Sequence, residues 1–481
     1  MTGVLGIAVA LGLLILLAYR GYSVLLLAPA MAALAALLGG APLLASYTQV
    51  FMPALGGFIV QYFPLFLLGA VFGKLMEDTG SANAIARAIA ATFGEGNAIA
   101  AIVLACALLT YGGVSLFVVA FAVYPIAAAM FSRAGLTPNL IPATIALGAF
   151  TFTMTALPGT PAIQNAIPMP YFGTTAFAAP GLGIIAGAIM LGLGLVWLTR
   201  RARAESHAST VAPREPADAP RKALREYAQG EGYDVTEIAP GDATGADGPP
   251  LWVAIAPIVL VVSLNYLFAA HLLDRMDTAY LAEPLYGSTR FDTLRGVWAI
   301  LVALILSIVA MVALNLSRLP KLKGTLADGA NAATGPAFNT ASLVGFGAIV
   351  ASLPAFGLVR DAVLSIAPGN PLISLAVAVN ILAGITGSAS GGMSIALQTL
   401  GATYLELARE AGIAPELLHR VTAIATGGLD ALPHNGAVIT LLAVCKSTHK
   451  AAYKDIFVVA VAFPIVALVA VIVLGSLFGS F

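Results

Sequence analysis

The sequence has few charged residues. Asp, Glu, Lys and Arg together make up 10% of the 481 residues, whereas a soluble domain carries about 25%. This shortage excludes a large soluble fold and predicts a polytopic membrane protein embedded in a lipid bilayer. Basic and acidic residues number 23 each, and this balance gives no indication of a nucleic-acid partner.

Cysteine is almost absent as well. Cys106 and Cys445 are the only two, and both lie inside apolar runs. They exclude a disulfide framework and are expected to be small buried side chains, and no motif indicates a metal or a cofactor. The N-terminus lacks a basic segment and a small-residue cleavage site before Arg20. The first apolar run is therefore expected to be a retained span and not a signal peptide.

Long apolar runs are what the chain has in abundance. A bilayer crossing needs about 20 such residues, and ten runs predict full spans, two of them broken by proline: 3–19, 22–40, 57–76, 138–172, 178–199, 250–271, 293–317, 335–359, 419–445 and 455–479. Two more apolar regions, 97–131 and 371–408, are each divided by Gly, Ser and Thr. Each arm would span only about 21 Å of helix, so both regions are predicted to be re-entrant hairpins.

A polar segment at 200–249 separates two membrane halves, 1–199 and 250–481. Its Ala, Pro, Asp, Glu and Gly content predicts a solvated linker. If the N-terminus lies outside, 17 of the 23 basic residues fall on the inner side, as the positive-inside rule expects. Both termini are therefore predicted outside and the linker in the cytoplasm. The six basic residues assigned to the outside are Arg275, Arg290, Arg295, Arg360, Arg409 and Arg420.

The two halves share short motifs at offsets of 275 to 277 positions. The pairs are Thr110–Ser115 with Thr386–Gly392, Ala134–Pro138 with Ala411–Pro415, and Ala156–Pro161 with Ala431–Gly436. Because the second half begins on the opposite side of the membrane, the pattern predicts two inverted repeats in an all-α fold. Secondary transporters have this architecture and bind substrate and ions at discontinuous helices near the midplane.

A helix that begins at membrane depth points free N–H groups and its positive dipole end into the protein, where they can hold an anion. Short polar side chains gather at the predicted breaks, which favours a small carboxylate with hydroxyl groups as substrate. The candidate substrate-binding residues are Thr110, Gly112, Gly113, Ser115, Gly159, Thr160, Gln164, Asn165, Thr386, Ser388, Ser390, Gly391, Gly392, His434 and Asn435. The alternative is that the small residues only allow tight helix packing.

Ionisable residues inside a span are costly and are usually functional or paired. Asp430 and His434 are such residues, and two interpretations stay open. They carry a coupled proton, or they form a mutual pair that holds the break in place. Glu77 and Asp78, before the first hairpin, are expected to be solvated.

Four strings in this sequence resemble the gluconate permease (GntP) family, a branch of a larger ion-transporter superfamily. They are Gly384–Ser394, Asp430–Gly436, Cys445–His449 and Tyr453–Asp455, and Pro158–Asn165 extends the likeness into the first half. The resemblance implies a proton-coupled importer of small hydroxylated monocarboxylates, such as gluconate or 3-hydroxybutyrate, in a bacterial inner membrane. It also implies a homodimer in which a transport domain with both hairpins moves as an elevator.

Three other functions are weighed against this one. Sodium could replace the proton, and a passive channel would lack coupling altogether. An intramembrane hydrolase would need Ser390 and His434 within hydrogen-bond reach, and an inverted repeat gives an enzyme no advantage. The prediction is a transporter and not an enzyme.

Overall fold

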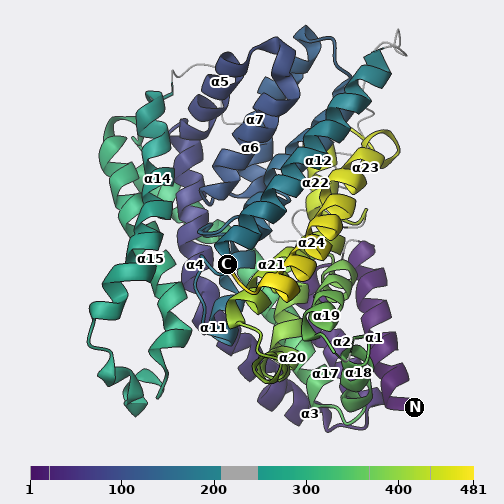
Figure 1. Cartoon of the computed structure of the whole chain (residues 1–481). Helices are drawn as coiled ribbons and strands as arrows, with labels where there is room; N and C mark the ends of the chain where they lie inside the picture. Colours follow the sequence, from purple (N-terminus) through teal and green to yellow (C-terminus); the bar gives the residue numbers. More distant parts are fainter. Residues whose placement is uncertain (1, 21, 207–247, 368, 434) are drawn as a thin grey trace.

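The computed structural model describes residues 2–20, 22–206, 248–367, 369–433 and 435–481 (Figure 1). Within these ranges every regular element is a helix, which agrees with the predicted all-α membrane fold. Most of the predicted linker, at 207–247, lies outside the described residues, and so does His434.

The first half begins with helices that lead up to the first hairpin: α1 (Thr2–Tyr19), α2 (Val24–Leu38), α3 (Leu43–Ser46), α4 (Met52–Asp78) and α5 (Ser81–Phe93). A π-helical turn at Tyr47–Phe51 joins α3 to α4. The remaining helices of this half form the hairpin, an interrupted segment and a long final helix: α6 (Ala98–Tyr111), α7 (Leu116–Arg133), α8 (Ile141–Ala149), α9 (Phe152–Thr155), α10 (Ile163–Ala166), α11 (Pro168–Phe172) and α12 (Pro180–Ser206).

The second half begins with two long helices that lie side by side in Figure 1, α14 (Leu251–Leu267) and α15 (Phe291–Leu314). The other helices of this half are α16 (Leu322–Ala332), α17 (Thr334–Ser352), α18 (Phe356–Leu364), α19 (Pro371–Thr386), α20 (Ala389–Glu410), α21 (Pro415–Leu429), α22 (Gly436–Val444), α23 (His449–Phe457) and α24 (Phe463–Phe478). The last helices of the two halves, α12 and α24, pack against each other (Figure 1).

Among the described residues, five helices are long and apolar enough to cross a membrane. They are Leu43–Asp78, Pro180–Ala204, Leu251–Arg275, Phe291–Leu314 and His449–Phe478. A sixth candidate is the pair Leu322–Ser352 and Phe356–Leu364, which is bent by 97°. The first two apolar runs form helices of only 18 and 15 residues, and the two spans predicted to be broken are divided into shorter helices. Ten full spans therefore stay a prediction.

The second hairpin is interrupted over a much shorter stretch than its sequence suggests. Helix α19 continues to Thr386 and α20 begins at Ala389. The Ser388 hydroxyl accepts a hydrogen bond from the Gly391 N–H at 3.1 Å and so caps α20. A Cβ atom on Gly392 would lie 2.2 Å from the Ala383 backbone nitrogen. Gly391 and Gly392 are thus helical residues, and Gly392 lets the two arms of the hairpin touch.

This close approach predicts that Gly392→Ala destabilises the hairpin. The added methyl group must push α19 and α20 apart, and overpacking of this kind costs about 1–3 kcal/mol or more. Gly357 in α18 is the matched control, because a Cβ atom there would have no neighbour within 4 Å. We expect a lower thermal unfolding midpoint in detergent for Gly392→Ala and an unchanged or higher one for Gly357→Ala. Equal midpoints for both variants would contradict the packing role.

Candidate functional site

A cavity of about 510 Å³ lies where the two hairpin tips meet the two interrupted segments. Its other wall is formed by α4, α16 and α17. The predicted site residues on its lining are Thr110, Gly113, Ser115, Gln164, Thr386, Ser388, Ser390, Asp430 and Asn435. Residues separated by more than 300 positions in the sequence are therefore brought together in one space.

The tip of the first hairpin is held against the first interrupted segment. Gly113 has a φ of +92°, and a Cβ atom there would lie 2.8 Å from the Pro161 ring. The neighbouring Tyr111 hydroxyl donates to the Pro158 carbonyl at 2.7 Å. Glycine is required at this tip both for its backbone conformation and for the contact with proline.

The tip of the second hairpin is linked to both of its neighbours. The Asn435 amide donates to the Gly387 carbonyl at 2.7 Å, and its oxygen accepts from the Ala437 N–H at 2.6 Å. Asn435 therefore caps α22 and fixes that helix to the hairpin tip. On the opposite side, Thr340 Oγ1 of α17 lies 3.3 Å from Ser390 Oγ.

Three helices begin at the cavity. Leu116 of α7, Ala389 of α20 and Gly436 of α22 all belong to its lining and lie in the first turns of their helices. Their N-terminal ends supply free N–H groups and a partial positive charge that favour an anion. A further helix begins after Pro158 and also reaches the cavity. The helix there, α10, has only four residues, so its dipole is too small to contribute in the same way.

Three described residues of the lining each have a buried polar side-chain atom without a hydrogen-bond partner. These atoms are Thr110 Oγ1, Gln164 Oε1 and Asn339 Nδ2. Leaving a buried donor or acceptor unsatisfied costs about 1–3 kcal/mol. This arrangement suits a site that a polar ligand completes.

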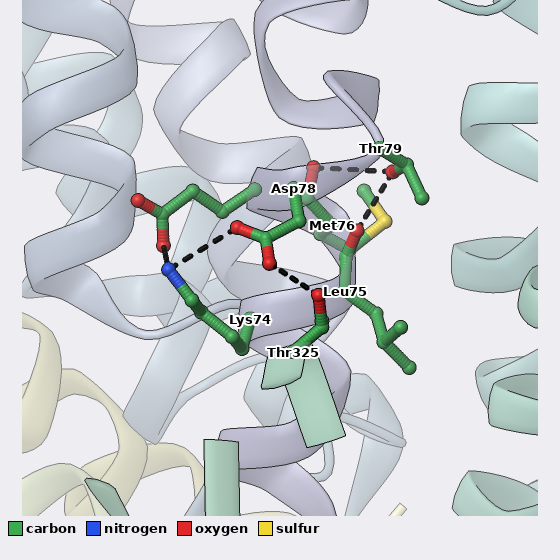
Figure 2. A network of polar contacts seen from close by, with 7 residues as sticks. Lys74, Leu75, Met76, Asp78, Thr79 and Thr325 are labelled. Carbon is green, nitrogen blue, oxygen red and sulfur yellow. Dashed lines mark hydrogen bonds and ion pairs between the residues drawn. The ribbon is translucent and has the colours of Figure 1, made fainter. Parts of the chain in front are cut away.

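The charged groups on the lining are Lys74, Glu77, Asp328 and Asp430, and Lys74 is the one cation among the described lining residues. Its ammonium lies 3.4 Å from Glu77 Oε2 and 3.1 Å from Asp78 Oδ1. Figure 2 shows Lys74 and Asp78 together with Thr325 of α16, whose hydroxyl donates to Asp78 Oδ2 at 2.5 Å.

The side chains of Glu77 and Asp78 stay 35% and 29% exposed, as expected for solvated groups, and they also take part in this network. Glu77 lines the cavity, and Asp78 joins α4 to α16. Spacings of three and four residues place both carboxylates beside one lysine on a helix. That spacing was the signal in the sequence that could have identified the network.

Several predicted site residues lie off the cavity lining. They are Gly112, Gly159, Thr160, Asn165, Gly391 and Gly392. Gly112 and Gly159 lie against Ile258 and Phe177, where they serve packing. His434, predicted both to bind substrate and to carry a proton, lies outside the described residues.

Asn165 is fully buried and lies off the cavity lining. It links parts of the first interrupted segment by hydrogen bonds. Its amide donates to the Thr160 and Ala176 carbonyls at 3.1 and 3.0 Å. Its oxygen can only accept, so His419 Nε2, at 3.1 Å, is the donor. The second ring nitrogen of His419 then accepts from the Thr174 hydroxyl at 2.6 Å.

Arg420 of α21 completes the same network. Its side chain is 0% exposed and donates to Asn165 Oδ1 at 3.2 Å and to the Thr155 carbonyl at 3.3 Å. It also donates to the Ala178 carbonyl at 2.7 Å and to that of Ala176 at 3.4 Å. Arg420, which was counted among the basic residues on the outside, is therefore buried within the protein, and its side of the membrane stays a prediction. Carbonyl oxygens freed by the interrupted helix provide its partners.

This network predicts a large stability effect for Arg420→Met. The substitution removes the Arg420 donor from the carbonyls of Thr155 and Ala178, whereas the Ala176 carbonyl keeps the Gly159 N–H and the Asn165 amide. Each buried acceptor left unsatisfied costs about 1–3 kcal/mol. Arg409→Met, at the exposed end of α20, is the control and should cost less than about 1 kcal/mol. Thermal unfolding of the purified protein measures both, and a similar midpoint for the two variants would contradict the role of Arg420.

Comparison with known proteins agrees with a transport function. No family model matches the chain. The sequence is 42% identical to the uncharacterized transporter YxjC of Bacillus subtilis (strain 168) over 488 residues, which cover 98% of each protein. The crystal structure of the YdaH transporter of Alcanivorax borkumensis, described as having an unusual topology, aligns with a TM-score of 0.51 and 17% identity. That alignment covers 88% of this chain and 87% of YdaH, and at this identity it concerns the fold alone.

Proposed function

The chain belongs to the family of membrane transporters that includes YxjC, and from this premise we propose that it imports small hydroxylated monocarboxylates together with protons. That it is a multi-pass membrane transporter and not an enzyme follows from the family. The cavity carries the finer proposal, because three helix N-termini and a set of hydroxyl and amide groups converge on it.

The size and polarity of the cavity support a small polar anion. Its volume of about 510 Å³ falls in the usual range for small-molecule sites. The helix ends of α7, α20 and α22 offer positive potential without a bound metal. The hydroxyl groups of Ser115, Ser388 and Ser390 would serve the hydroxyl groups of the substrate.

The order of helices supports the proposed pair of inverted repeats. In the first half, the hairpin α6–α7 precedes the interrupted segment α8–α11 and the long helix α12. The second half repeats that order in α19–α20, α21–α22 and α23–α24. We infer that both hairpins and both interrupted segments move together past α4, α16 and α17, as in an elevator. The resemblance to the gluconate permease family extends the proposal to a homodimer in a bacterial inner membrane, with both termini periplasmic.

Asp430 is the proposed proton carrier. It lines the cavity directly after α21, within reach of a bound anion. A carboxylate and an anionic substrate repel each other in a space of low polarity, so protonation of Asp430 would favour substrate binding. The second interpretation, a pair with His434 that holds the break, stays as the alternative. Sodium is the alternative coupling ion.

The coupling ion can be tested in proteoliposomes that contain the full-length protein. A proton gradient with the acidic side outside should drive accumulation of labelled 3-hydroxybutyrate or gluconate inside the vesicles. A sodium gradient alone should not. Uptake driven by sodium alone, or by neither gradient, would refute proton symport.

Asp430→Asn should abolish the pH-driven accumulation, with a loss of at least tenfold, because the amide cannot release a proton. Substrate counterflow should survive, since exchange needs no net proton movement. The exposed Asp277, in the connection between α14 and α15, provides the control variant Asp277→Asn. Loss of counterflow together with a lower unfolding midpoint would assign Asp430 a structural role instead.

A further inference from the structure

Asn339 on α17 is a buried amide whose donor has no acceptor. Only 8% of the residue is exposed, it lines the cavity, and Nδ2 lies without a partner. It belongs to none of the hairpin or break motifs. We propose that Asn339 binds the substrate and that it completes the site from the wall opposite the second hairpin tip. This inference rests on the proposed function.

The other buried asparagines show why Asn339 differs. In the part of the chain that the structure describes, each of them donates Nδ2 to a backbone carbonyl. The acceptors of Asn265, Asn315 and Asn380 are Gly159, Met311 and Ala376, at 3.2, 3.0 and 3.0 Å. Asn165 and Asn435 also donate to carbonyls. The other buried asparagines among the described residues therefore stabilise the backbone by donating to its carbonyls. The amide nitrogen of Asn339 makes no such hydrogen bond.

The position of Asn339 points its function toward the hairpin. The next residue, Thr340, reaches across to Ser390 of the second tip. Ser390 in turn lies 3.5 Å from Ser388, the residue that caps α20. Asn339 and Thr340 both line the cavity, so a ligand oxygen at the start of α20 would lie beside α17. A rotation of the Asn339 side chain, whose Nδ2 is enclosed in this structure, would let that nitrogen donate to it.

The two other unpaired groups define what the ligand must offer. A carboxylate accepts from Asn339 Nδ2 and from the Thr110 hydroxyl, but it has no hydrogen to donate. Gln164 Oε1 can only accept, so it requires an O–H or N–H group on the ligand. A small acid that carries both a carboxylate and a hydrogen-bond donor has the groups to satisfy all three, whereas an unsubstituted carboxylate has no donor for Gln164. Sites that bind a substrate hydroxyl reject analogues that lack it much more strongly than apolar pockets reject a missing methyl group.

The test is titration calorimetry on the full-length protein with three probes: 3-hydroxybutyrate, butyrate and 3-aminobutyrate. Wild type should bind 3-hydroxybutyrate at least about tenfold more tightly than butyrate, the ratio that one satisfied buried acceptor produces. Gln164→Met should reduce this ratio to less than about threefold, because the acceptor is lost from the site. Asn339→Leu should weaken binding of 3-hydroxybutyrate and of butyrate alike by about tenfold.

Two further variants separate binding from folding. Asn339→Asp has nearly the same shape and replaces the donor by a carboxylate, so it should weaken binding at least as much as Asn339→Leu. Asn315→Ala is the matched control, because Asn315 is buried with one unpaired amide atom but lies off the cavity. Its affinity for 3-hydroxybutyrate should stay within about twofold of wild type even if its unfolding midpoint falls.

The outcomes distinguish the inference from the function on which it rests. Normal binding of 3-hydroxybutyrate by both Asn339 variants would overturn the inference and leave the proposed function intact. Failure of wild type to bind any of the three acids would overturn both. Tighter binding of 3-aminobutyrate than of 3-hydroxybutyrate would support the donor requirement at Gln164 and overturn the hydroxyl group as its source.

Discussion

The unpaired backbone of an interrupted helix is the constraint on which this fold depends. Carbonyl groups released inside a membrane protein must find donors within the protein, since lipid offers none. In the first half a side chain from the second half meets a large part of that need. Arg420 gathers the carbonyls of Thr155, Ala176 and Ala178, and Asn165 adds two more contacts within the segment. The interruption is therefore built by both halves of the chain.

The second interruption is stabilised in a different way. Asn435 caps α22 with its oxygen and reaches the Gly387 carbonyl with its amide, so a residue of the break itself holds the break to the hairpin tip. Breaking the hydrogen bonds of a buried arginine with several carbonyl partners costs much free energy. Breaking the partly buried contact of one asparagine costs less. The cavity accordingly has one side that is fixed by charge and another that is held by neutral hydrogen bonds.

The sequence predicts those parts of the site that depend on local preference. Glycine, serine and proline disfavour helix interiors, so Ser115, Ser388 and Asn435 could be assigned to breaks without knowledge of the fold. Which glycine allows a turn and which allows packing depends on distant neighbours. Gly392 was therefore assigned to binding although it packs on Ala383.

The residues that were missed or misplaced have their partners far away in the sequence. Arg420 entered the sequence analysis only as one of the outside basic residues, because counting charges does not identify carbonyl partners 242 to 265 positions away. Asn339 belongs to none of the sequence motifs and was not among the candidate residues. Its importance lies in a missing partner, and that can be recognised only when every neighbour is in place.

The charges on the cavity lining give a physical reason for coupling an anion to a proton. Lys74 already interacts with Glu77 and Asp78, so little of its charge remains for a substrate. The other charged groups on the described lining, Asp328 and Asp430, are carboxyls. The positive helix ends must then attract an anion despite the repulsion from these carboxylates. Protonation of one carboxylate removes part of that repulsion. Linkage is reciprocal, so a bound anion and a bound proton each lower the cost of bringing in the other. Under the proposed function, symport would require no separate coupling device, because one cavity would bind both the anion and the proton.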